Sequence, residues 1–216
     1  MRRFHVLAVT GLTVLAVVAA TPANAATAVT KRQVRHSLLT AAQLGDGWHR
    51  IDSSSGEDSA DIQGCGSEGT SARPAGLRFQ PQRDFQYGQV LSLVNEQIYS
   101  FRTVRNAKAG FVASVRELRG CDSFTVDGKT WHVKRLTMPS YADQRAMYRF
   151  SGPVATASGD VPMTMFLVAT RYGRHEVTIA AMLAGQLTST DRTVVKRGVV
   201  RIAKAATLKV QDRLGR

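Results

Sequence analysis

Residues 87–103 read YGQVLSLVNEQIYSFRT, and this stretch decides the fold class. Side chains along an extended strand point alternately to its two faces. One face would carry Val90, Ser92, Val94, Glu96 and Ile98, and the other Leu91, Leu93, Asn95, Gln97, Tyr99 and Phe101. Because both faces hold apolar residues, the stretch predicts a long strand with both faces partly covered. Glu96 is expected to be a buried or edge carboxylate with its hydrogen bonds satisfied.

A helix is predicted directly after this strand, over residues 106–119. Its apolar positions recur at helical intervals and form one stripe of Ala107, Phe111, Val115 and Leu118. Gly120 would end the helix, immediately before Cys121. The pattern is typical of a helix that packs against a sheet by one face.

The next part of the chain alternates strands with turns. Strands are predicted over 124–136, 144–151, 161–171 and 175–183. Asp127-Gly128 divides the first of them, because this dipeptide is typical of a two-residue hairpin turn. Residues 151–160, SGPVATASGD, read as a turn-rich connection. Hairpins join antiparallel neighbours, so we expect an antiparallel sheet.

A second long helix is predicted over residues 189–209, with Thr188 and Asp191 as a capping pair. Its buried stripe would be Val195, Val199, Ile202 and Ala206, and its basic face Arg197, Arg201 and Lys204. Two helices with one apolar stripe each can cover one face of an antiparallel sheet. The predicted architecture is therefore a two-layer α+β domain, with both helices on the same face.

The stretch LLTAAQLGDGWHRID precedes the long strand, at residues 38–52. Thr40 opens a capping box, and Gly45 can end the short turn in a left-handed conformation. Gly47 lets the chain turn again, and Trp48 is large enough to fill a hydrophobic gap. We expect this stretch to be a small structural lid with Trp48 buried.

The first 25 residues are predicted to be an export signal. Arg2 and Arg3 precede an apolar run, and Thr21-Pro22-Ala23-Asn24-Ala25 ends in a small-x-small cleavage pattern. An uncleaved anchor is the alternative, because the apolar run approaches the length of a membrane span. The expected division is a signal peptide at 1–25, a leader at 26–37, one domain at 38–210 and a tail at 211–216. No membrane span is expected after cleavage, and the oligomeric state is left open.

The chain is strongly basic, with 29 Lys and Arg against 16 Asp and Glu and a formal net charge of +13. The signal holds two of the arginines and no acid, which leaves +11 for the mature chain. This charge predicts attraction to anionic envelope polymers or lipid headgroups, unless it merely keeps the surface solvated. Nucleic acid ranks lower, because no basic strand carries interleaved aromatic residues.

Five arginines are the candidate ligand-binding residues. Arg145 and Arg149 share one face of a predicted strand, and Arg135 lies on a neighbouring strand. Arg171 and Arg174 bracket a predicted hairpin tip. The planar guanidinium suits carboxylate or phosphate, so we expect an anion to bind if these side chains converge. The alternative is a sheet face that is wetted by charges.

No catalytic or metal-binding pattern is found in the sequence. The histidines after the signal, His36, His49, His132 and His175, lack metal-ligand spacing, and no G-x-S-x-G elbow occurs. His175 and Glu176 are adjacent on a strand, so they should point to opposite faces. We expect no cofactor, no metal and no enzymatic activity. A hydrolase acting on envelope material is the alternative, and a histidine beside a carboxylate in one pocket would favour it.

Cys65 and Cys121 are the two cysteines of the chain. Export and an even number of cysteines predict a disulfide between them. The pair would tie the Ser- and Gly-rich loop around Cys65 to the end of the first long helix. A metal site is not favoured, because neither cysteine has a second ligand at a suitable spacing.

The order of these motifs resembles the actinobacterial sensor-domain family. LLTAAQLGDGW, a cysteine, VNEQIYSF and a helix ending in RGCDSF follow one another over residues 38–208. The family includes the extracellular sensor domain of a mycobacterial serine/threonine kinase, kinase H, and secreted relatives without a kinase. The resemblance implies structural roles for Leu39, Thr40, Leu44, Gly47 and Trp48, and for both cysteines.

The resemblance also implies an α+β domain with a cleft that binds a ligand. The sequence departs from the kinase type in having no kinase, no stop-transfer segment and one possible disulfide instead of two. The leading hypothesis is therefore a secreted, non-catalytic, sensor-like domain at the cell envelope. Its ligand would be an anionic envelope component or an unknown small molecule. A basic protein-interaction module is a further alternative.

Overall fold

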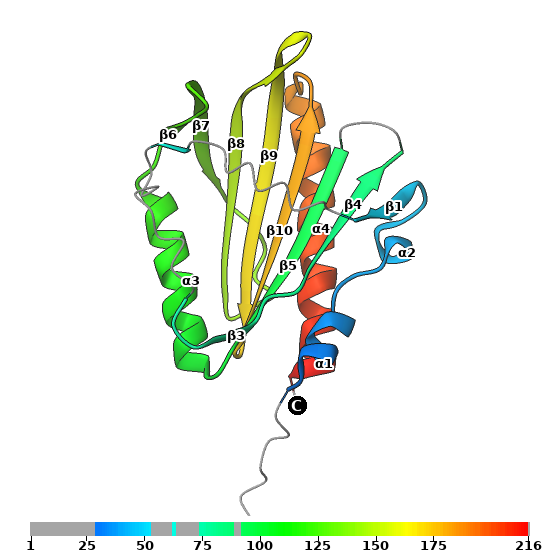
Figure 1. Ribbon diagram of the computed structural model, residues 1–216, viewed down its shortest axis with the longest axis vertical. Coiled ribbons are helices and arrows are strands. Elements are labelled where there is room, and N and C mark those ends of the chain that lie inside the picture. Colours follow the sequence, from blue (N-terminus) through cyan, green and yellow to red (C-terminus); the bar gives the residue numbers. More distant parts are fainter. Residues whose placement is uncertain (1–28, 53–61, 64–73, 89–91, 216) are drawn as a thin grey trace, which may run out of the picture.

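The computed structural model describes residues 29–52, 62–63, 74–88 and 92–215, and their strands form one large sheet (Figure 1). The strands are β1 Trp48–Ile51, β2 Ile62–Gln63, β3 Leu77–Phe79, β4 Gln82–Tyr87, β5 Ser92–Phe101, β6 Ser123–Val126, β7 Lys129–Leu136, β8 Gln144–Thr156, β9 Gly159–Tyr172 and β10 His175–Ala184. The helices are α1 Lys31–His36, α2 Ala41–Leu44, α3 Val104–Arg119 and α4 Ser189–Leu214.

The sheet is antiparallel throughout the described residues, as the hairpin signals predicted. Its order is β1-β4-β5-β10-β9-β8-β7-β6-β2, and β3 pairs with β5 beside this path. The pairing of β5 with β10 joins the first half of the chain to the second. It places β5 inside the sheet, between β4 and β10.

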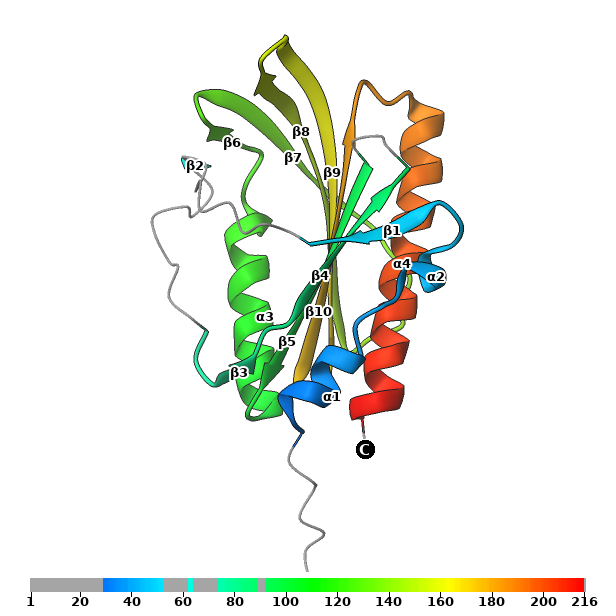
Figure 2. The ribbon, with the colours of Figure 1, turned by 45° about the vertical axis from the view of Figure 1, so that its right-hand side comes forward.

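The two long helices cover opposite faces of the sheet, so the predicted placement on one face is wrong (Figure 2). Phe111 of α3 packs in one cluster with Tyr148 of β8. Val199 of α4 packs in a separate cluster with Met147 of β8. Tyr148 and Met147 are adjacent, so their side chains leave opposite faces of the strand. A sheet that is apolar on both faces needs cover on both, which gives three layers instead of two.

The predicted helix stripes are confirmed in part. Ala107, Phe111 and Val115 of α3 and Val199 and Ala206 of α4 are buried, whereas Leu118, Val195 and Ile202 are only partly buried. Helix α4 begins with the predicted Thr188 and Asp191 capping box. Helix α4 runs past residue 209 and buries Val210 and Leu214. Helix α1 begins inside the predicted leader, with a capping box between Thr30 and Gln33. Val29 and Val34, which also lie in the predicted leader, belong to the core. The ordered domain is therefore longer than 38–210 at both ends.

The β6–β7 hairpin confirms the Asp127-Gly128 prediction. Both residues have positive φ, 49° and 75°, as a tight primed turn requires. The predicted connection over 151–160 is wrong, because β8 and β9 continue as a paired hairpin to Thr156 opposite Gly159. Glycine, proline and serine suggested a loop there, whereas the antiparallel pairing extends the strands through these residues.

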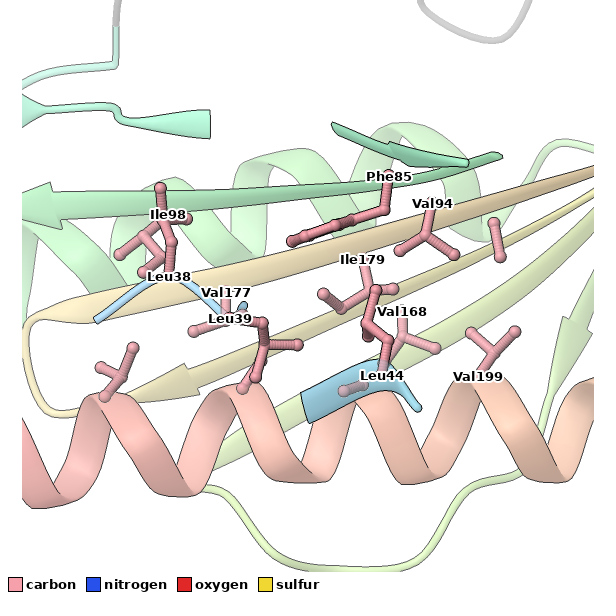
Figure 3. Close-up of a cluster of buried hydrophobic side chains, with 14 of the residues drawn as sticks. Leu38, Leu39, Leu44, Phe85, Val94, Ile98, Val168, Val177, Ile179 and Val199 are labelled. Atoms are coloured by element: carbon pink, nitrogen blue, oxygen red, sulfur yellow. The ribbon is translucent and has the colours of Figure 1, made fainter. Parts of the chain in front are cut away.

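The N-terminal stretch packs between the sheet and α4 (Figure 3). Leu38, Leu39 and Leu44 are buried there, and the Gln43 side chain accepts a hydrogen bond from the Thr40 N–H at 3.0 Å. Trp48 is only partly buried at the edge of this core, so the prediction of a buried Trp48 is wrong. Its ring lies 5.4 Å from the ring of Tyr87.

The glycines around this turn differ from the prediction in one detail. Gly47 has φ 82°, and a Cβ there would lie 2.8 Å from the Tyr87 ring, so both conformation and space require glycine. Gly45 ends α2 with φ 114° and ψ −177°, which is not the left-handed helical conformation.

Two sequence predictions fall partly or wholly outside the described residues. Cys121 is not a free cysteine, but Cys65 lies outside the described residues, so the Cys65–Cys121 disulfide stays a prediction. The export signal at 1–25 lies outside them as well. Among the described residues, no helix is both long and apolar enough to span a membrane.

Candidate functional site

A cavity of about 790 Å³ lies between α3 and the sheet, and we call it the α3 cleft. Its described lining is Pro74, Gln80, Asn95, Gln97, Tyr99, Phe101, Gly110, Ser114, Val115, Leu118, Tyr148, Leu167, Ala169, Glu176, Thr178 and Ala180. Helix α3 provides four of these residues, and β5 and β10 provide most of the polar ones. The cleft therefore has a helix as one wall and the centre of the sheet as the other.

The strand alternation determines which side chains face the α3 cleft. In β5 the odd-numbered residues Asn95, Gln97 and Tyr99 line it, whereas Val94 and Ile98 pack in the core beneath α4. The same alternation in β10 places Glu176, Thr178 and Ala180 in the cleft and Val177 and Ile179 in that core.

The register of β5 and β10 then aligns the polar residues into pairs. Tyr99 lies opposite Glu176, and Gln97 lies opposite Thr178. We call these four residues, with Asn95, the polar ladder. Cross-strand partners on one face lie close enough to act on one ligand.

Hydrogen bonds fix the orientation of the polar ladder. The Tyr99 hydroxyl donates to Gln97 Oε1, and Gln97 Nε2 donates to Gln82 Oε1 at 3.2 Å. Asn95 Nδ2 donates to Asp84 Oδ1 at 2.6 Å. Burial, assisted by the charge of Glu176, raises the pKa of Tyr99 to about 12. Tyr99 is therefore a neutral hydrogen-bond donor in the physiological pH range.

Glu176 is the chemically distinctive residue of the cleft. Its side chain is buried, with 6% of the residue exposed, and burial raises its pKa to about 7 against the opposing charge of Arg171. Its charge is influenced by Arg171, but the guanidinium of Arg171 pairs with Asp143 Oδ2 at 3.1 Å and not with this carboxyl group. A buried carboxyl group that faces a cavity without a partner is able to receive a donor from a ligand.

The five predicted arginines do not converge. Arg149 faces the α4 side beside Arg192, and burial lowers its pKa. Arg174 lies in the turn between β9 and β10, where its carbonyl accepts a hydrogen bond from Phe101 N at 3.0 Å. Arg171 is engaged within the fold: its guanidinium contacts Gln144 Oε1 at 2.5 Å, the Gly173 carbonyl at 2.7 Å and Asp143 Oδ2 at 3.1 Å.

Arg135 lines a separate pocket of about 270 Å³ beside α3, and Arg145 borders it. The Arg145 side chain leaves β8 on the α4 side, like that of Arg149, and its Nε donates to the Met138 carbonyl at 3.4 Å. Arg116 and Arg119 of α3 line the same pocket, which we call the arginine pocket. Sequence reasoning missed these two, although their spacing of three residues places them on one helix face. Phe111, Val112 and Val115 supply apolar lining.

The histidines do not form a catalytic arrangement in the described part of the chain. His175 is buried on the face opposite to Glu176, burial lowers its pKa to about 4, and neither ring nitrogen has a described partner. No histidine lines the α3 cleft or the arginine pocket among the described residues. Those residues also contain no group of three His, Cys, Asp or Glu side chains suited to a metal.

The polar ladder itself was missed by sequence reasoning. Its signal was present in the alternation of residues 92–101, where the face opposite to Val94 and Ile98 carries Asn95, Gln97 and Tyr99. A strand face that mixes polar and apolar residues is expected both on a solvent-exposed surface and on the wall of a cleft. The position of α3 over that face distinguishes the two.

Comparison with known proteins gives a structural relationship only. No family model and no curated protein matches this chain. The antiparallel sheet with a helix on each face has the fold of an extracellular domain of known structure. That domain is the extracellular domain of PknH from Mycobacterium tuberculosis, with a TM-score of 0.54 and 10% sequence identity. The match covers 83% of this chain and 97% of that one, and at this identity it shows a shared fold.

Proposed function

We propose that the protein is an extracellular, sensor-like domain that binds a small molecule in the α3 cleft without catalysing a reaction. The convergence of the polar ladder on one wall of the cleft carries the proposal. Ligand sites of proteins are typically about 300–1,000 Å³, mostly apolar, and contain a few convergent polar groups. The α3 cleft has this size, and Phe101, Leu118 and Leu167 supply apolar lining beside the ladder.

The proposal favours binding over hydrolysis because of the groups in the described lining. A glycosidase needs two carboxyl groups across the scissile bond, and the described lining has one, that of Glu176. A nucleophilic hydrolase needs a base beside the nucleophile, and Ser114 donates instead to the Gly110 carbonyl at 3.2 Å within its own helix.

An extracellular location at the cell envelope is part of the proposal. The apolar stretch after Arg2 and Arg3, the net charge of +13 and the fold of the PknH extracellular domain support it. The arginine pocket is the proposed contact for anionic envelope polymers or lipid headgroups. Three arginines on the α3 side, Arg116, Arg119 and Arg135, line this pocket, and the guanidinium group favours phosphate or carboxylate.

Filling the α3 cleft tests the ligand site. Ala180→Trp places a large ring in the cleft, whereas Val104→Trp adds the same ring at the exposed start of α3. We expect wild type and Val104→Trp to retain small molecules from a cell-envelope extract in native mass spectrometry, and folded Ala180→Trp to lose them. Equal retention by both variants would contradict a ligand in this cleft.

Binding to lipid vesicles tests the arginine pocket. Arg116→Gln with Arg135→Gln removes two charges from the pocket, and Arg105→Gln with Arg201→Gln removes two exposed charges elsewhere. We expect the first pair to weaken sedimentation with phosphatidylglycerol vesicles more than the second. Equal losses from the two pairs would mean that net charge alone holds the protein to the surface.

A further inference from the structure

The charge of the α3 cleft is opposite to that of the molecule as a whole. The chain has 29 basic residues, yet no lysine or arginine belongs to the described lining of the cleft. The ionisable groups of the described lining are the Glu176 carboxyl and the Tyr99 and Tyr148 hydroxyls. None of these provides a counter-ion for an anion, and burying an unpaired charge is unfavourable.

Glu176 has the geometry of a counter-ion for a ligand. It is the second residue of β10, near the turn that joins β9 to β10, opposite Tyr99 on β5 and Arg171 on β9. Its residue is more than nine-tenths buried, and its carboxyl group has no described hydrogen-bond donor. Its oxygens are not among the fully enclosed atoms without a partner, so they are open to the cleft and can accept hydrogen bonds from a ligand there.

Arg171 does not fill that position. Its Nε bonds to Gln144, and its Nη1 lies 2.7 Å from the Gly173 carbonyl and 3.1 Å from Asp143 Oδ2. The guanidinium is therefore engaged with Asp143, and it acts on Glu176 only through its charge. The carboxyl group keeps its capacity to accept hydrogen bonds from a ligand.

From this arrangement we infer that the α3 cleft takes an amphiphilic cation, with an ammonium or guanidinium group on Glu176 and an apolar body between α3 and the sheet. The inference rests on the proposed function of the cleft and names the class of its ligand. Gln97 and Thr178 form the next cross-strand pair on the same face, two residues along from Tyr99 and Glu176. They provide polar groups for a neutral part of the same molecule. The apolar body would lie against Phe101, Leu118 and Leu167.

Three probes that share one apolar body test the inference: phenylbutylamine, phenylbutanol and phenylbutyrate. Each is titrated into the wild-type protein at a pH above 7, where Glu176 is ionised, and followed by calorimetry and by the amide NMR shifts of Tyr99 and Thr178. We expect the amine to bind about tenfold more tightly than the alcohol, as a charge-assisted hydrogen bond provides. The carboxylate is expected to bind most weakly.

Two variants assign the preference to one carboxyl group. Glu176→Gln keeps the shape and the acceptor oxygen, and we expect the amine to lose about tenfold in affinity while the alcohol is unchanged. Asp212→Asn removes one negative charge from the exposed surface of α4, on the other face of the sheet, and is expected to change neither.

The outcomes separate this inference from the ligand cleft itself. Equal binding of all three probes in the cleft, or tightest binding of the carboxylate, would overturn the cationic class and leave the cleft as a ligand site. Binding of the amine that survives Glu176→Gln would likewise overturn it. If none of the probes perturbs the cleft residues, both the class and the ligand site fail.

Discussion

At the scale of single residues, Glu96 is the clearest departure from ordinary solvation. It is fully buried, and its Oε2 accepts a hydrogen bond from the Leu39 N–H at 2.6 Å, while Oε1 has no described partner. Lys209 and Arg83 lie nearby and donate to the Leu38 and Leu39 carbonyls rather than to Glu96. The expectation of a satisfied carboxylate is therefore correct for one oxygen only. Burial raises the pKa of Glu96 to about 7.

This raised pKa predicts how stability depends on pH. Between the ordinary value of 4.5 and about 7, the unfolded chain has ionised Glu96 while the folded chain keeps it protonated. The folded state therefore binds more protons, and its free energy of unfolding falls as pH rises through this range. Glu176 contributes with the same sign.

Replacing Glu96 by its neutral isostere tests the sign. Urea unfolding from pH 4.5 to 7.5 should show a stability loss in wild type, on the order of a few kcal/mol. In Glu96→Gln the loss is expected to be smaller, with the Glu176 contribution remaining. An unchanged slope in the variant would show that Glu96 is already ionised in the folded protein at low pH.

At the scale of elements, two glycines predict opposite responses to the same substitution. Gly152 lies in β8, where a Cβ would be 2.6 Å from the Trp131 ring, so the strand needs glycine for close approach. Gly198 lies inside α4, where a Cβ would meet nothing within 4 Å. Close packing therefore requires glycine at position 152 and not at position 198.

Gly152→Ala and Gly198→Ala form a matched pair for thermal unfolding. We expect Gly152→Ala to lower stability, because Trp131 has to move, and Gly198→Ala to raise it by about 0.5–1 kcal/mol. If Gly152→Ala were neutral, the Trp131 ring would have room that the structure does not give it.

At the scale of the whole molecule, the N-terminal stretch joins the layers. Leu39 is fully buried among residues of the sheet and α4, whereas Trp48 only borders this core. Lys209 of α4 also donates to the Leu38 carbonyl at 2.6 Å and to Gln43 Oε1 at 2.8 Å. The stretch is therefore held from both the sheet and the helix.

The loss of stability on truncating these two side chains to alanine should follow their burial. We expect Leu39→Ala to cost about 2–5 kcal/mol, the range for a fully buried leucine. Trp48→Ala should cost less, because its side chain is only partly buried at the edge of the core. Chemical denaturation of both variants compares their free energies of unfolding directly. A larger loss of stability for Trp48→Ala would support the original prediction that Trp48 is a buried core residue of this stretch.

Local patterns predicted the elements of this fold but not their assembly. The Asp127-Gly128 turn, the α3 stripe and the Thr188 cap each depend on residues within a few positions of one another, so the sequence reveals them. The placement of α3 and α4 on opposite faces depends on which strands pair, as with Tyr99 of β5 and Glu176 of β10. The polar ladder arises from the same distant pairing, which explains why sequence reasoning selected arginines instead.

The contact between α1 and α4 has a consequence for how the domain can be handled. Val29 and Leu214 belong to one core cluster, so the chain enters and leaves the fold at the same end (Figure 2). The β8–β9 tip at Thr156 and Gly159 is exposed and lies at the other end of the sheet (Figure 1). Neighbouring termini tolerate circular permutation and insertion into a host protein. A short peptide could join residues 29 and 215, and new termini could be opened at the β8–β9 tip. The permuted domain could then be inserted into a fluorescent protein as the ligand-binding part of a reporter.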